Sequence, residues 1–199
     1  MRLAILLSGR GSNFAAIHEA IVRGELDAQI VCVISNRPGA GGIEHARALG
    51  LPAHVVDHRG FESRVAHEAE VLMLLENARP DFIALAGYMR LLSPAFIAAY
   101  PMRIINIHPS LLPAFPGVDA QAQAVAYGVK ISGCTVHFVD ENLDAGPIIV
   151  QRAVAVRPDD DASTLAARIL EEEHIAYVEA LGKLASGNYR VEGRRVICE

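Results

Sequence analysis

The sequence predicts an α/β fold: a single Rossmann-like domain with a mostly parallel twisted sheet, helices on both faces, and an antiparallel strand pair in its second half. Short apolar runs rich in branched residues recur along the chain, and helical patterns lie between them. Over roughly the first 110 residues the two kinds of segment alternate, as in right-handed βαβ units. With 199 residues, of which 52% are hydrophobic and 21% charged, the chain suits one compact domain spanning residues 1–199, or at most two small ones.

Six apolar runs bounded by Gly, Pro or Asp are the expected strands. They are continuous rather than alternating in polarity, which is typical of strands covered on both faces. The first follows Met1-Arg2 directly and is too short for a signal peptide or a membrane span, so we expect a buried first strand. The runs are Leu3 to Leu7, Ile30 to Ile34, Phe82 to Ala86, Arg103 to Ile107, Cys134 to Val139 and Ile148 to Val150.

Helical patterns fill the intervals between these strands. After Ser12-Asn13, which has the composition of a capping pair, apolar residues recur at helical spacing until Gly24. A second helix is expected from Phe61 to Ala78, with an apolar stripe formed by Val65, Ala69, Leu72 and Leu75. The remaining expected elements are a short helix from Ser93-Pro94 to Pro101, another from about Asp119 to Tyr127 before Gly128, a long helix from about Ser163 to Ala185, and a hairpin turning at Glu192-Gly193.

The second half of the chain departs from the alternating pattern. The strands near Cys134 and Ile148 are joined by a loop from Asp140 to Pro147. That loop is too short for a crossover helix, so the two strands should be antiparallel. The sheet is therefore expected to be mixed.

Composition excludes several classes of function. Eighteen Lys and Arg residues against 23 Asp and Glu residues leave a net charge of -5, which disfavours binding to a long nucleic-acid backbone. The three cysteines, Cys32, Cys134 and Cys198, lie far apart and form no C-x-x-C motif, so neither a disulfide framework nor a zinc site is expected. A reducing cytoplasm is the simplest location, with no membrane partner.

The first candidate motif is Ser8-Gly9-Arg10-Gly11-Ser12-Asn13, between the first strand and the first helix. Glycines let the backbone approach an anion, and a helix N-terminus offers free N–H groups, so the motif suits a phosphate. A tight structural turn and a dinucleotide site are the alternatives. The dinucleotide fingerprint is incomplete, because Phe14 stands where a third glycine belongs, although Arg37 after the second strand suits a 2′-phosphate such as that of NADP.

The second motif is Asn106-Ile107-His108-Pro109-Ser110, at the end of an apolar strand. Residues two apart in a strand face the same side, so Asn106 and His108 project together at the carboxyl edge, where open α/β sheets bind ligands. An amide and an imidazole donor suit an oxyanion better than a metal ion. The alternative is a strand end with a structural histidine.

The third candidate is Asp144, in the loop Leu143 to Pro147. An aspartate before glycine is usually a local turn residue. If this loop lies beside the strand of His108, however, the carboxylate favours the imidazolium and keeps the histidine an effective acid near neutral pH. His137, on the strand face opposite Cys134 and Val136, is expected to be mainly structural.

Four motifs in order resemble the folate-dependent formyltransferases. They are Ser8-Gly9-x-Gly11-Ser12-Asn13, Gly87-Tyr88-Met89-Arg90-Leu91-Leu92, Asn106 to Pro113, and Leu143-Asp144-Ala145-Gly146-Pro147. The resemblance covers essentially the whole chain. It implies transfer of a formyl group from 10-formyltetrahydrofolate to the amine of glycinamide ribonucleotide, in purine biosynthesis, by an enzyme that is a monomer or a homodimer and holds no metal.

The resemblance also implies roles for individual residues. Asn106 and His108 would polarise the formyl oxygen, and Asp144 would assist proton transfer. Residues 1–100 would form a phosphate-binding half and residues 101–199 a catalytic and folate-binding half. The ribonucleotide would contact Gly11, Ser12, Asn13, Phe14, Ala15 and Glu173. The formyl-folate would contact Arg64, Met89, Arg90, Leu91, Leu92, Asn106, Asp140 and Asp144.

Sister enzymes and other classes remain as alternatives. Methionyl-tRNA formyltransferases add a carboxy-terminal tRNA-binding domain, and formyltetrahydrofolate deformylases add an amino-terminal regulatory domain. This chain has its first strand at residue 2 and ends soon after its last helix, so we expect neither addition. A hydrolase that uses water in place of the amine, and a folate- or nucleotide-binding module without activity, also remain. The segment Val118-Asp119-Ala120-Gln121 differs from some relatives, which carry histidines there.

Overall fold

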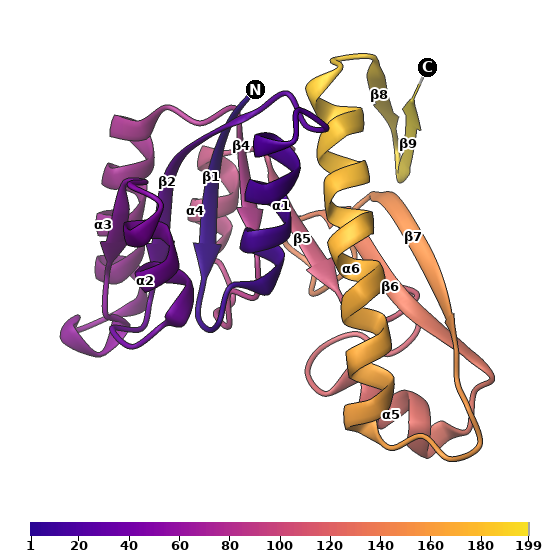
Figure 1. The fold of residues 1–199 in the computed structure, drawn as a ribbon. Coiled ribbons are helices and arrows are strands. Elements are labelled where there is room, and N and C mark those ends of the chain that lie inside the picture. The colour runs from indigo at the N-terminus through magenta and orange to yellow at the C-terminus, as the bar shows by residue number, and fades with distance from the viewer. Residues whose placement is uncertain (199) are drawn as a thin grey trace. The chain divides into compact units, whose positions relative to one another are not determined.

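The computed structural model describes residues 1–198, which form two compact units, Met1–Ile105 and the part that begins at Asn106 (Figure 1). Strands and helices alternate in the first unit, as the sequence predicts, although not every element was predicted. They are β1 (Arg2–Leu7), α1 (Ser12–Val22), β2 (Gln29–Ser35), α2 (Gly41–Ala48), β3 (Ala53–Val55), a 3-10 turn η1 (His58–Gly60), α3 (Arg64–Ala78), β4 (Phe82–Leu85) and α4 (Pro94–Ala99), followed by β5 (Ile104–His108) at the boundary.

The strands of the first unit are parallel, in the order β3-β2-β1-β4. Ile5 in β1 pairs with Val33 on one side and with Ala84 on the other. Every residue from Leu3 to Leu7 is fully buried. Because neighbouring side chains of a strand point to opposite faces, both faces of this sheet are covered. The predicted parallel, doubly covered sheet is thus confirmed.

Two helix predictions need correction. Helix α1 is not capped by Ser12 and Asn13: its N-cap is Gly11, in the left-handed conformation, and no side chain caps it. Helix α3 begins at Arg64 rather than Phe61, and Ser63 caps it by accepting the Ala66 N–H. Its buried face consists of His67, Glu68, Val71 and Leu75, whereas Val65, at the start of the predicted stripe, is 71% exposed.

Helix α2, strand β3 and the 3-10 turn η1 of the first unit were not predicted. Helix α2 begins with two glycines and spans only eight residues, and β3 has three half-buried residues. Segments this short do not repeat long enough to show a helical or strand period. Their position matters, because α2 packs against the loop that follows β1: the Gly42 N–H donates to the Gly9 carbonyl over 3.1 Å.

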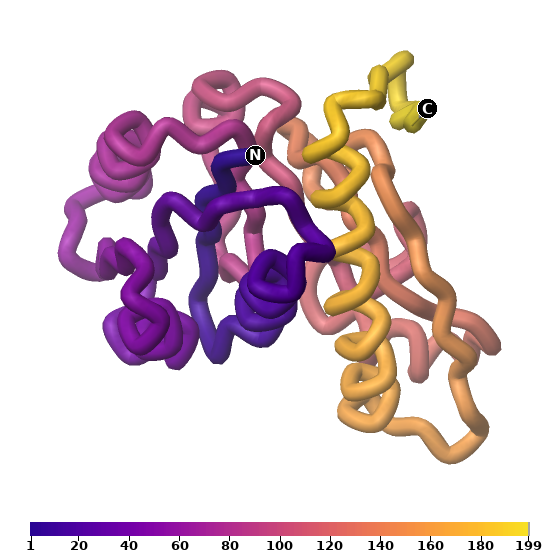
Figure 2. The backbone as a smooth tube through the Cα atoms, turned by 45° about the horizontal axis from the view of Figure 1, so that its top comes forward, coloured from indigo at the N-terminus to yellow at the C-terminus, as the bar shows by residue number. Residues whose placement is uncertain are grey.

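The second unit has the strand order β6-β7-β9-β8. Strands β6 and β7 are antiparallel, as predicted, but they are longer than the apolar runs from which they were predicted. Figures 1 and 2 show α6 lying along these two strands. Asp161 and Thr164 form a capping box at the start of α6. The elements are α5 (Ala120–Tyr127), β6 (Ile131–Phe138), β7 (Ile148–Ala155), α6 (Ala162–Ala185), β8 (Tyr189–Glu192) and β9 (Arg195–Cys198).

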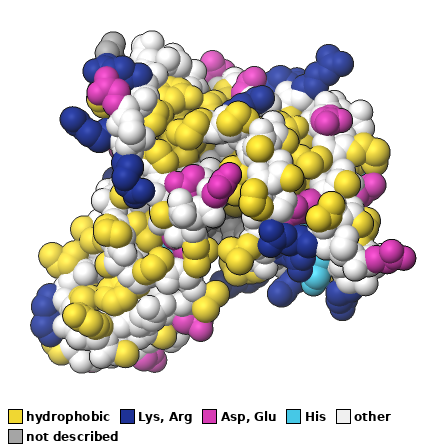
Figure 3. Space-filling view, turned by 180° about the vertical axis from the view of Figure 1, so that it is seen from behind, with side chains coloured by type: hydrophobic (Ala, Val, Ile, Leu, Met, Phe, Trp, Pro, Cys, Tyr) yellow, Lys and Arg dark blue, Asp and Glu magenta, His cyan; other side chains and the backbone are white. Residues whose placement is uncertain are grey.

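The surface and the helices bear on possible partners. Among residues 1–198, no helix combines the length and the apolar character that a membrane crossing requires. On the face shown in Figure 3, Lys and Arg side chains are scattered among acidic and apolar ones. They form no continuous basic field there of the kind that holds a phosphate backbone.

Candidate active site

The predicted catalytic side chains Asn106, His108 and Asp144 meet in one cluster of the second unit. The Nδ1 atom of His108 lies 3.3 Å from Oδ2 of Asp144. Asn106 joins the cluster through His137, whose Nε2 lies 3.3 Å from Nδ2 of Asn106 and 3.8 Å from Oδ1 of Asp144. Strand β5 and the β6–β7 loop, separate in the sequence, therefore supply one polar site.

His137 is the member of this cluster that sequence reasoning took as structural. A register shift in the β6–β7 pairing between Val136 and His137 marks a local irregularity, a feature common beside active sites. The His137 side chain is buried, with its Nδ1 bonded to the Phe138 carbonyl over 2.8 Å. His137 lies on the strand face opposite Cys134 and Val136, which is also the face of the neighbouring strand end. This position was the only sign in the sequence that His137 could join the site.

The hydrogen bonds of His137 assign its proton. The Phe138 oxygen can only accept, so Nδ1 carries the hydrogen. Burial lowers the pKa of His137 and keeps the ring neutral, so Nε2 presents a lone pair. The Asn106 amide nitrogen donates to that lone pair, which fixes the orientation of the carboxamide and leaves its second N–H available.

His108 is also held at both ring nitrogens. Its Nε2 lies 2.8 Å from the Phe115 carbonyl oxygen, and its Nδ1 faces the Asp144 carboxylate. Both partners are acceptors, so a ring that donates from both nitrogens fits this geometry. A substrate oxygen that takes the Nε2 proton must compete with the Phe115 carbonyl.

The loop around Asp144 is rigidly placed. Asp144 has a φ of +49°, and the Gly117 N–H donates to its Oδ2 over 2.8 Å. At Gly146 an added Cβ would lie 1.8 Å from the Phe138 carbonyl oxygen, so only glycine fits. These constraints hold the carboxylate toward the two imidazoles.

The predicted phosphate loop lies in the first unit, between β1 and α1. An added Cβ at Gly11 would lie 2.9 Å from the Gly42 Cα, so this glycine is required by the packing of α2 as well as by its φ of +77°. The first turn of α1 has no side-chain cap and no acidic residue. The first-turn N–H groups, which no side chain caps, and the helix dipole therefore suit an anion. Phe14 is fully buried and Ala15 is half-buried, so Phe14 offers only its backbone.

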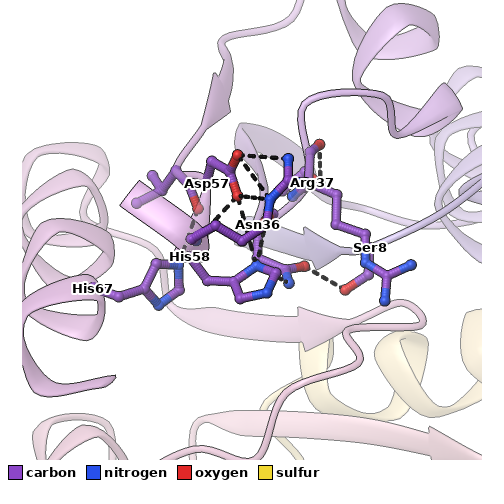
Figure 4. A network of polar contacts seen from close by, with 9 residues as sticks. Ser8, Asn36, Arg37, Asp57, His58 and His67 are labelled. Atoms are coloured by element: carbon purple, nitrogen blue, oxygen red, sulfur yellow. Dashed lines mark hydrogen bonds and ion pairs between the residues drawn. The ribbon is translucent and has the colours of Figure 1, made fainter. Parts of the chain in front are cut away.

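A polar network joins this loop to Asn36, which follows β2, and to His58 in η1 (Figure 4). Ser8 donates its hydroxyl to Oδ1 of Asn36 over 2.5 Å and accepts the Met89 N–H over 2.8 Å. The Asn36 amide in turn lies 3.2 Å from Nδ1 of His58. Ser8 thus connects the predicted phosphate loop to the predicted folate-binding segment. The Arg37 side chain makes no hydrogen bond or ion pair with any described residue.

The predicted folate-binding residues of the first unit are accessible. Met89 is 65% and Leu91 64% exposed, so both side chains are open to a ligand. Nε of Arg64 lies 3.5 Å from Oε1 of Glu68. Glu68 is buried and accepts both the backbone N–H and the hydroxyl of Ser93, which caps α4. Glu68, which sequence reasoning did not single out, fixes the end of this segment.

The remaining residues that were predicted to contact a substrate, Glu173 and Asp140, lie in the second unit. Glu173 lies in α6 and is 9% exposed, and Asp140 accepts the Asn142 N–H over 2.9 Å at the start of the β6–β7 loop. Within residues 1–198, no three His, Cys, Asp or Glu side chains are grouped as metal ligands.

Comparison with known proteins gives consistent matches. Residues 1–181 match the family described as Formyl transferase. The chain is 50% identical over 192 residues to the trifunctional purine biosynthetic protein adenosine-3 of Drosophila pseudoobscura pseudoobscura, a match that covers 95% of this chain and 14% of that protein. The chain therefore spans about a seventh of the length of this relative.

Two solved structures cover the chain almost completely. Glycinamide ribonucleotide transformylase 1 from Symbiobacterium toebii superimposes with a TM-score of 0.97 at 46% identity, covering 100% of this chain and 93% of the other. A formyltetrahydrofolate deformylase from Pseudomonas syringae pv. tomato str. DC3000 gives a TM-score of 0.93 at 30% identity, covering 99% of this chain and 65% of the other.

Proposed function

The chain belongs to the formyl transferase family, and from this premise we propose that it transfers the formyl group of 10-formyltetrahydrofolate to the amine of glycinamide ribonucleotide. The products are formylglycinamide ribonucleotide and tetrahydrofolate, in a step of purine biosynthesis. The observation that carries this proposal is the 46% identity to a glycinamide ribonucleotide transformylase along the entire chain, together with the cluster of Asn106, His108 and Asp144.

The reaction is a direct attack. The amine nitrogen bonds to the formyl carbon, the bond from that carbon to N10 of the folate breaks, and the amine loses a proton while N10 gains one. This sequence requires positioning of two substrates, donors for the developing oxyanion and a route for the proton. We assign the donors to Asn106 and His108 and the support of the charged imidazole to Asp144.

We assign His137 the positioning of Asn106. His137→Leu removes the lone pair that holds the Asn106 amide, and we expect kcat to fall about tenfold with little change in either KM, because the oxyanion donor loses its orientation. His137→Gln retains an acceptor oxygen and should recover most of the activity. Steady-state kinetics test this pair of variants. Equal losses in both would show that His137 acts by packing rather than through its hydrogen bond.

For the ribonucleotide, we propose that its phosphate binds at the N-terminus of α1, along residues Gly11 to Ala15. The uncapped N–H groups of that turn support this assignment. Glu173 would contact the glycinamide part as a hydrogen-bond acceptor.

For the folate, we propose that Arg64, Met89 to Leu92, Asp140 and Asp144 line the binding site. A pteridine needs a largely apolar slot with a few polar groups, and the exposed side chains of Met89 and Leu91 would supply apolar contact. The cationic Arg64 would meet a carboxylate of the folate tail.

This assignment predicts a hydrogen-exchange pattern. A non-reactive folate analogue should slow amide exchange at Arg90 to Leu92, whose segment has no regular secondary structure. Met89 is a poor reporter, because its N–H already bonds to Ser8. Exchange measured by mass spectrometry with and without the analogue checks this. Protection confined to residues 8 to 15 would place the folate elsewhere.

A second candidate function is hydrolysis of the formyl-folate, favoured by the 30% identity to a deformylase. The two differ in their need for an amine. Purified protein should release tetrahydrofolate from 10-formyltetrahydrofolate only when glycinamide ribonucleotide is present. Turnover at the same rate without the ribonucleotide would establish the hydrolase instead, and saturable binding with no turnover would establish a binding module.

We further propose that the enzyme works in the cytoplasm on these small molecules, as a monomer or homodimer. Cys32 and Cys134 are buried free thiols, and burial raises the pKa of Cys32 to about 11 and that of Cys134 to about 12. Such inert thiols suit a reducing compartment.

A further inference from the structure

A cavity of about 340 Å³ lies in the second unit and shares only Asp144 with the residues to which binding roles are assigned above. Two loops form it: residues 112–116, which follow β5, and residues 143–146, which join β6 to β7. Ile148 at the start of β7 and Arg194 in the β8–β9 turn close the cavity. This volume is in the range of small-molecule sites.

The cavity borders the 143–146 loop, which carries Asp144 of the catalytic cluster. Asn106, His108 and His137 do not line it. The carboxylate of Asp144 is directed to the two imidazoles, whereas the cavity extends toward β7 and the hairpin, where Ile148 pairs with Arg195. The Asp144 carboxylate thus belongs to the catalytic cluster, whereas the loop that carries it forms part of the cavity wall.

The cavity wall combines mostly apolar side chains with one cationic side chain. Most of the lining side chains are apolar, among them Leu112, Pro116, Leu143 and Ile148. Arg194 is the one cationic lining residue, and it makes no hydrogen bond or ion pair within residues 1–198. The nearby Glu192 is already paired with Arg190 over 2.8 Å. An unopposed guanidinium at the edge of an apolar hollow is complementary to a carboxylate on an apolar body.

We propose that this cavity binds a small apolar carboxylic acid, and that its occupancy alters the placement of Asp144. Both loops of the wall carry active-site hydrogen bonds: the Phe115 carbonyl accepts from His108, and the Gly117 N–H just beyond the first loop donates to Asp144. A ligand that contacts both loops therefore changes the relative positions of the imidazole and the carboxylate. Binding does not depend on the proposed formyl transfer, but the effect on turnover rests on it.

Titration of the ¹⁵N-labelled protein with 2-naphthoate tests the site. We expect saturable amide shifts at Leu143, Ala145 and Gly146, and about tenfold weaker binding in Arg194→Gln, which loses a charge-assisted contact. Arg195→Gln is the matched control: it removes the same charge one residue away, outside the lining, and should change the Kd less than about twofold. Neutral 2-naphthamide should bind wild type about as weakly as 2-naphthoate binds Arg194→Gln.

Several outcomes would overturn the proposal. These are the absence of saturable shifts, equal weakening in both arginine variants, or shifts centred on residues 89–92 with competition against the formyl-folate. In the activity assay, 2-naphthoate should change kcat in wild type and Arg195→Gln, and leave Arg194→Gln unaffected at the same concentration. Unchanged wild-type kcat at saturation would refute the coupling to Asp144. If no formyl transfer is found at all, the titration still decides the binding site on its own.

Discussion

Asp144→Asn is expected to reduce kcat for formyl transfer by about 10²- to 10³-fold, with much smaller changes in both KM values. Asparagine has nearly the same shape as aspartate and still accepts the Gly117 N–H, so the loop should keep its conformation. What it loses is the negative charge 3.3 Å from His108. The imidazolium is then less favoured, and the developing oxyanion loses its charged donor.

The neighbouring residue Glu141 provides the control. It is exposed in the same loop, so Glu141→Gln removes one carboxylate without touching the cluster and should leave kcat nearly unchanged. Steady-state kinetics with each substrate varied in turn separate kcat from KM. A rise in KM at constant kcat in Asp144→Asn would assign the residue to binding alone.

The hypothesis that Asp144 supports His108 also predicts the activity of the double variant. His108→Ala should lose a similar amount of activity, because it removes the donor that Asp144 supports. If the two residues serve one proton network, the double variant should be scarcely slower than the slower single variant. Multiplicative losses would mean that they act independently. Steady-state kinetics of the two single variants and the double variant provide the check.

The elements that sequence reasoning located are those with long or fully apolar patterns. The strand from Leu3 to Leu7 and the helix ending at Ala185 are present within a residue or two of their predicted ends. The antiparallel β6–β7 pair followed from the length of its loop alone. Asn106, His108 and Asp144 were identified because strand ends and a glycine-containing loop fix where such side chains project.

The failures have a common physical cause, namely partners distant in sequence. In α3 the buried positions include His67 and Glu68, which are polar in sequence but bonded to the Val56 carbonyl and to Ser93. A pattern of hydrophobicity cannot reveal those bonds, so it selected exposed Val65 instead. His137 was missed for the same reason, because its role depends on Asn106 and Asp144.

Gly11 shows how one residue can satisfy two explanations. The absence of a side chain at Gly11 was explained by the close approach of an anion. The same absence also leaves room for Gly42 of α2. A bulky substitution such as Gly11→Val would therefore disturb the packing of α2 and could not isolate phosphate binding. A test of the anion site needs a variant that leaves this contact intact.

Ser12→Asp is such a variant, and we expect it to raise the KM for glycinamide ribonucleotide about tenfold or more while the KM for the formyl-folate stays nearly constant. Ser12 is the first residue of α1, where no side chain caps the helix and no acidic residue is present. A carboxylate there interacts favourably with the helix dipole, so the melting temperature should be unchanged or slightly higher. The same charge repels a phosphate bound to the first-turn N–H groups.

The opposite directions of these two effects make the experiment decisive. Loss of ribonucleotide binding together with unchanged or increased stability cannot be attributed to a damaged fold. Val22→Asp adds the same charge at the other end of α1, at a side chain that is 72% exposed, and should leave both KM values within about twofold because a charge there is far from the first turn and screened by salt. Raising the ionic strength should reduce the effect of Ser12→Asp, since the repulsion is electrostatic. If Ser12→Asp binds the ribonucleotide as tightly as wild type does, the phosphate does not sit at the N-terminus of α1, and the turn from Gly9 to Asn13 serves only to pack α1 against α2.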